Sequence, residues 1–131
     1  MNIKLGKILA EISAGELIDK LTILEIKLSK LNDENKKIEV KKELKSLNIT
    51  FESHIPRISN DLKKFKLELK ETNLKLWDIE EQKRLAEKKQ VFDDEFINLS
   101  RKVYKFNDHR AKIKFKINEL LGSNIKEVKS Y

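Results

Sequence analysis

The sequence predicts an all-α fold, an elongated and mostly antiparallel bundle of three or four helices with coiled-coil character. Apolar residues recur at helical spacing from residue 13 to residue 121. The 131-residue chain holds one proline and three glycines, and 39% of its residues are charged, which suits long amphipathic helices. The length predicts one helical domain, residues 1–131, with non-helical tails at 1–12 and 123–131.

The first helix has a clear beginning. Ser13 and Glu16 have the spacing of a capping box, in which each side chain bonds the backbone N–H of the other. A leucine seam at alternating spacings of four and three follows, at residues 17, 21, 24, 28 and 31. The polar run 32–35 interrupts the seam and predicts a turn.

A second helix is expected over residues 34–51, and a third over residues 57–89. Pro56 separates them, because proline lacks an N–H and disfavours helical geometry in the residue before it. A helix over 57–89 is about 50 Å long at ~1.5 Å per residue. It needs an antiparallel neighbour of similar length or a second subunit, and we expect a homodimer because an isolated hairpin buries little surface.

The last helix is predicted to follow a turn at residues 90–94, with Asp93 or Asp94 as its N-cap. Asn107 and Asp108 lie in its middle and can restart it as a fresh cap. Gly122 follows the final leucines and has the position of a C-terminal capping glycine.

The net charge of +7 is unevenly distributed. Residues 71–95 carry eight acidic and five basic side chains, whereas residues 96–131 carry nine basic and three acidic. Of the 29 basic residues, 25 are lysine, whereas arginine is preferred for bidentate phosphate contacts. We therefore expect no specific nucleic-acid binding and keep weak binding to nucleic acid or an anionic surface as an alternative. Its candidate basic surface comprises Lys102, Lys105, Lys112, Lys114 and Lys116.

The sequence offers few groups for catalysis. It has no cysteine and only two histidines, which excludes thiol chemistry and histidine-rich metal centres. It also lacks a glycine-rich phosphate loop, and we expect neither a metal nor a cofactor. An enzyme with carboxylates near Asp78, Glu80 and Asp108 is the last-ranked alternative.

Two groups of polar residues stand out. The first is Glu16, Asp19 and Lys20, whose acids suit the N-terminal turn of a helix. The second is predicted to meet across the last hairpin, either as a recognition patch or as a buried network that fixes helix register, and the register role is favoured. This candidate patch comprises Trp77, Asp78, Glu80, Tyr104, Asn107, Asp108 and Arg110.

Two stretches support a resemblance. The N-terminal one reads SAGELIDKLTILEIK, from residue 13 to residue 27, and the C-terminal one runs from Leu76 to the closing KSY of residues 129–131. Together they resemble a family of small bacterial and viral proteins known only as a domain of unknown function. His109 stands where the resemblance leads us to expect Glu. The resemblance implies a self-contained protein and brings no activity, cofactor or substrate.

These observations predict a non-catalytic structural or protein-interaction module that presents helical faces to an unknown partner protein. No segment approaches the ~20 apolar residues of a membrane span, and no secretory signal is present. We therefore expect a cytoplasmic protein.

Overall fold

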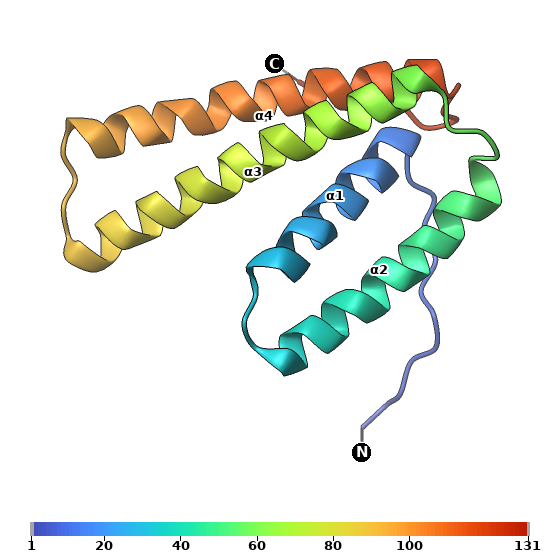
Figure 1. The fold of residues 1–131 in the computed structure, drawn as a ribbon, viewed down its shortest axis with the longest axis horizontal. Helices are drawn as coiled ribbons and strands as arrows, with labels where there is room; N and C mark the ends of the chain where they lie inside the picture. Colours follow the sequence, from blue (N-terminus) through green and yellow to red (C-terminus); the bar gives the residue numbers. More distant parts are fainter. Residues whose placement is uncertain (1, 131) are drawn as a thin grey trace.

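The structure is a computed structural model that describes residues 2–130, and these residues form four α-helices. Helix α1 spans Ala14–Lys30, α2 spans Glu34–His54, α3 spans Asn60–Lys89 and α4 spans Asp94–Leu120. Figure 1 shows α3 and α4 side by side as a long antiparallel hairpin, with α1 against it and α2 outermost beyond α1. The predicted all-α bundle is confirmed.

Side-chain caps fix the beginning of every helix. The Ser13 hydroxyl accepts a hydrogen bond from the Glu16 N–H at 3.1 Å, as predicted, and Asp33, Ser59 and Asp93 cap the other three helices. The second half of the predicted capping box does not form. The Glu16 carboxylate instead pairs with lysines, one of them on α4.

Several predicted boundaries shift. Helix α2 continues to His54, and α3 begins only at Asn60, because the loop after Pro56 runs on to the capping Ser59. Helix α4 passes through residues 107 and 108 without a break. After α4, Gly122 adopts φ 59°, and the N–H of Ser123 donates to the Asn118 carbonyl at 2.8 Å. This is the predicted glycine cap of the Schellman type.

The apolar core lies where α1 meets the N-terminal half of α3 and the C-terminal half of α4. Its fully buried members are Ile18, Leu62, Leu69, Ile113 and Ile117. Helix α2 has no buried residue, and α1 is the only helix that it approaches along its length. Helix α1 is therefore covered on two faces, by α2 on one and by the α3–α4 hairpin on the other.

The expected neighbour of the long third helix comes from the same chain. Helix α3 has 30 residues, and the 27 residues of α4 run antiparallel to it. The first of the two expected alternatives, an antiparallel neighbour, is therefore present, so the length of α3 does not by itself require a second subunit. The homodimer stays a prediction. Among the described residues, no helix is long and apolar enough to cross a membrane.

Candidate functional site

A buried carboxylate joins three helices. Asp19 of α1 is 0% exposed. Arg110 of α4 donates from Nε to Asp19 Oδ1 at 3.0 Å and from a terminal nitrogen to Oδ2. Asn73 of α3 donates from Nδ2 to Oδ1 of the same carboxylate at 2.8 Å. One side chain thus ties α1 to both helices of the long hairpin.

The polar side chains around this carboxylate are also hydrogen-bonded to one another. The Asn73 amide also donates to Thr22 Oγ1 at 2.9 Å, and that hydroxyl donates to the Asp19 carbonyl at 2.7 Å. The hydrogen bonds to Asp19 raise the pKa of Arg110 despite its partial burial. Removing a charge from water is costly unless it is paired and hydrogen-bonded, so this satisfied arrangement favours one register of α1 on the hairpin.

The ammonium group of Lys114 lies near three carboxylates, including that of Asp19. Its side chain is 12% exposed, and its Nζ lies 2.5 Å from Glu16, 3.7 Å from Asp19 and 3.3 Å from Glu127 of the C-terminal tail. Burial lowers the pKa of Lys114, but the hydrogen bond and the acidic charges outweigh burial and leave it raised. Burial likewise opposes ionisation of Glu16, yet Lys114 and Lys20 leave its pKa lowered.

Helix α1 and helix α4 approach closely at Gly15. The Gly15 N–H donates to Asn118 Oδ1 at 2.6 Å. A Cβ at this position would lie 2.5 Å from the backbone oxygen of Lys114, so only glycine permits the contact. The neighbouring Ala14 N–H donates to Ser123 Oγ at 3.0 Å. The first turn of α1 is thus fixed against α4 and the segment that follows it.

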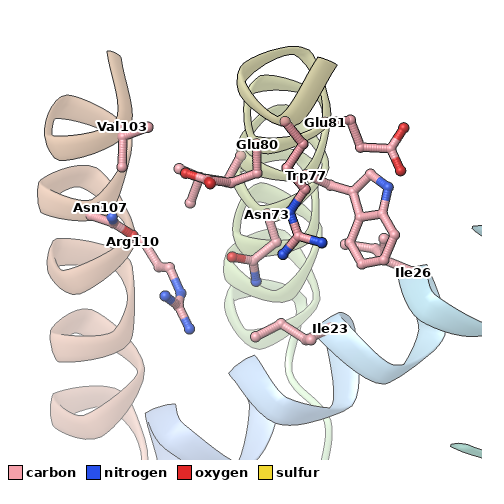
Figure 2. A pocket seen from close by; sticks show the side chains of 11 residues that line it. Ile23, Ile26, Asn73, Trp77, Glu80, Glu81, Val103, Asn107 and Arg110 are labelled. Atoms are coloured by element: carbon pink, nitrogen blue, oxygen red, sulfur yellow. The ribbon is translucent and has the colours of Figure 1, made fainter. Parts of the chain in front are cut away.

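A cleft opens beside this network, where the second half of α1 leaves the hairpin. In Figure 2, Ile23 and Ile26 come from α1, Asn73 and Trp77 from α3, and the Arg110 side chain reaches from α4 toward α1. The volume is ≈ 370 Å³, within the range of small binding sites. We call it the Trp77 cleft, and its lining comprises Ile23, Ile26, Asn73, Leu76, Trp77, Glu80, Glu81, Arg84, Val103, Asn107 and Arg110.

Trp77 is the only tryptophan of the chain and a half-buried wall of this cleft. Its indole Nε1 is buried and has no hydrogen-bond partner among the described residues. A buried donor without a partner costs about 1–3 kcal/mol. The indole N–H of this wall has no acceptor among the described residues.

The structure brings together only part of the candidate patch. Trp77, Glu80, Asn107 and Arg110 line the cleft, and Arg110 pairs with Asp19 of α1 rather than with an acid of the last hairpin.

The other three patch residues lie elsewhere. Asp78 is 3.9 Å from Lys30 and lines a different groove, Tyr104 is 54% exposed, and Asp108 lines a cavity beneath the C-terminal tail. The predicted meeting of all seven residues is therefore wrong. Asp78, Glu80 and Asp108, the carboxylates considered for catalysis, line three different surfaces.

Sequence reasoning missed the central residue of the network. The sequence alone predicts that Asp19 interacts with the helix dipole of the first turn, whereas its partners lie 54 and 91 residues away in the chain. The sequence of α1 does contain a pattern that indicates a buried position for Asp19. Gly15, Asp19, Thr22 and Ile26 follow one another at helical spacing and form a second buried stripe beside the leucine seam.

The candidate basic surface is not one surface. Lys102 and Lys105 lie along the α3–α4 groove with His109, which is 3.3 Å from Glu68. Lys112 and Lys116 line the cavity beneath the C-terminal tail. Lys114 also lines that cavity, but its ammonium group pairs with acidic residues, so its assignment to an exposed basic surface is wrong.

The fold and the site define an all-α protein whose helices are joined by a buried polar network, with an apolar cleft beside it. The chain belongs to the family of unknown function DUF6165, which matches residues 8–131. No curated protein and no solved structure matches the chain.

Proposed function

We propose that this protein is a non-catalytic binding module whose Trp77 cleft takes an aliphatic, lysine-containing segment of a partner protein. The observation that supports it is the combination of apolar walls with acidic side chains in a cleft beside the buried network. Ile23, Ile26 and Trp77 belong to the walls, and Glu80 and Glu81 are exposed carboxylates of the lining. Aliphatic side chains suit such walls, and lysines suit such carboxylates.

The charge balance of the cleft favours a cationic ligand. Two arginines line it, but the guanidinium of Arg110 is occupied by the buried Asp19 carboxylate. The positive charge of Arg84 then remains against the two negative charges of Glu80 and Glu81, so the lining has a net negative charge. An apolar ligand with positive charges fits this balance better than an anion.

The neighbouring network supports the proposal because binding sites work best on rigid supports. Asn73 and Arg110 belong to the cleft lining and to the Asp19 network at once. One wall therefore has little freedom to rearrange, which reduces the ordering cost of binding.

The two alternatives have weaker support. Binding to nucleic acid or to an anionic surface would need the candidate basic surface, but Lys114 is engaged in internal ion pairs. The other four lysines of that surface line two separate grooves. An enzyme built on Asp78, Glu80 and Asp108 would need carboxylates that share one site, and these do not.

Peptide binding tests the proposal. A fluorescein-labelled peptide of alternating leucine and lysine should raise its anisotropy on titration with the protein, whereas a leucine–glutamate peptide should bind at least roughly tenfold more weakly, a difference of about 1.4 kcal/mol. The variant Glu80→Lys/Glu81→Lys should lose most of the binding.

The matched control is Glu71→Lys/Glu87→Lys, which makes the same charge change at two exposed positions of α3 outside the cleft. It should bind the lysine peptide nearly as the parent does. Absence of binding to protein whose cleft is vacant, or an equal loss in the two double variants, would contradict the proposal.

A further inference from the structure

The segment before α1 is the most exposed apolar stretch of the molecule. Residues 2–12, here called the N-terminal arm, contain no helix or strand, and all are exposed. Four large aliphatic side chains of the arm are 71–87% exposed, namely Ile3, Leu5, Ile8 and Leu9. Such a concentration of apolar surface on so short a segment indicates a binding element.

We infer that the arm of one copy occupies the Trp77 cleft of a second copy, which makes the protein an arm-exchanged homodimer. This inference rests on the proposed function of the cleft and names its occupant. Residues 3–9 read Ile-Lys-Leu-Gly-Lys-Ile-Leu, which is the aliphatic and lysine-containing chemistry that the cleft favours.

Charge and shape complement each other in this pairing. Lys4 and Lys7 are exposed and matched in number by Glu80 and Glu81 of the cleft lining. In an extended segment alternate side chains point to one side, so Ile3 and Leu5 can face the apolar walls while Lys4 lies at the rim of the cleft, where Glu80 and Glu81 are exposed. No other group lies within 4 Å of the position of a Gly6 Cβ, so the arm is free to bend there.

The path of the arm favours a second copy over its own cleft. Figure 1 shows the arm leaving the N-terminal end of α1 and running past α2, away from α3 and α4. The end of the arm next to α1 is held by a hydrogen bond that Asn124 Nδ2 donates to Glu11 Oε1 at 2.9 Å. The cleft lies toward the other end of α1, at Ile23 and Ile26.

An exchange between two copies is closed and symmetric. Each copy supplies one arm and one cleft, so a twofold axis relates two identical contacts and no cleft is left vacant. Seven extended residues reach about 23–25 Å at 3.3–3.6 Å each, which gives the arm enough length to lie along a neighbouring molecule.

Sedimentation equilibrium on full-length variants tests the inference. The parent chain should be a dimer at micromolar concentration. Leu5→Ser/Leu9→Ser and Lys4→Glu/Lys7→Glu should each weaken dimerisation by roughly tenfold or more. Combining Lys4→Glu/Lys7→Glu with Glu80→Lys/Glu81→Lys should restore it, because the ion pairs re-form with reversed sign.

The control is Ile38→Lys/Ile49→Lys, which alters the exposed face of α2 and should leave the dimer intact. A monomeric parent, a dimer insensitive to the arm variants, or a dimer lost only in the α2 variant would overturn the inference. If the leucine–lysine peptide binds the cleft of a monomeric parent, the arm exchange fails while the proposed function stands. If neither peptide nor arm binds, both fail.

Discussion

The Asp19–Arg110 pair should be the largest single polar contribution to the fold. In Arg110→Met, the carboxylate of Asp19 stays buried and loses its two guanidinium hydrogen bonds, keeping one from Asn73 and Lys114 at 3.7 Å. Removing one partner of a buried pair costs about 3–5 kcal/mol, and the remaining partners point to the lower end, about 3 kcal/mol. That is a large share of the 5–15 kcal/mol typical of a small domain.

Urea unfolding provides the assay. Far-ultraviolet circular dichroism reports the helices, and the fluorescence of the single tryptophan, Trp77, reports the site. If the two probes give coincident transitions, the unfolding is two-state and its free energy can be calculated from the curves. The control Arg101→Met removes an exposed arginine of the same helix and should change the free energy of unfolding by less than about 0.5 kcal/mol.

A double-mutant cycle sharpens the prediction. Asp19→Asn removes the buried charge that Arg110→Met leaves without its main partner, so the double variant should be more stable than the sum of the single effects by about 1–3 kcal/mol. If Arg110→Met unfolds within about 1 kcal/mol of the parent, or if the two effects simply add, the buried pair does not hold α1 on the hairpin.

Three further predictions concern the first turn of α1. Gly15→Ala should lower the free energy of unfolding by about 1–3 kcal/mol, because its Cβ meets the Lys114 carbonyl, whereas Gly6→Ala should have little effect in a thermal melt. Because the pKa of Glu16 is lowered in the folded state, the stability that this carboxylate contributes is complete above its ordinary pKa of about 4.5 and is lost as the pH falls through the folded pKa. Melting temperatures below about pH 4.5 should therefore fall less steeply in Glu16→Gln than in the parent. Ser13→Ala should cost about 1 kcal/mol in urea unfolding, the usual value of an N-cap, and no loss of stability would show that the cap is replaceable.

Local signals in the sequence predicted most of the helical architecture. Caps and breaks depend on residues within a few positions of each other, so the starts at Ser13 and Asp93 and the stop at Gly122 agree with the structure. The predicted start of α3 at residue 57 is three residues too early. Pro56 excludes helix locally but does not say where the next one begins, and Ser59 decides that.

The site could be predicted only in part, because it depends on contacts distant in the sequence. Asp19 lies off the leucine seam, on a face that would be exposed if α1 packed on one side only. Helix α1 is covered on two sides, and this second face meets Asn73 and Arg110 of the hairpin. No periodicity within α1 identifies partners that lie 54 and 91 residues away.

The identity of the cleft as the binding site can be tested most directly with its own tryptophan. Trp77 is the only tryptophan and lines the cleft, so a nitroxide-labelled leucine–lysine peptide bound there must quench its fluorescence on contact. The account predicts strong quenching that saturates with the anisotropy titration and disappears in Glu80→Lys/Glu81→Lys. Saturable binding of the labelled peptide with unquenched Trp77 emission would contradict it.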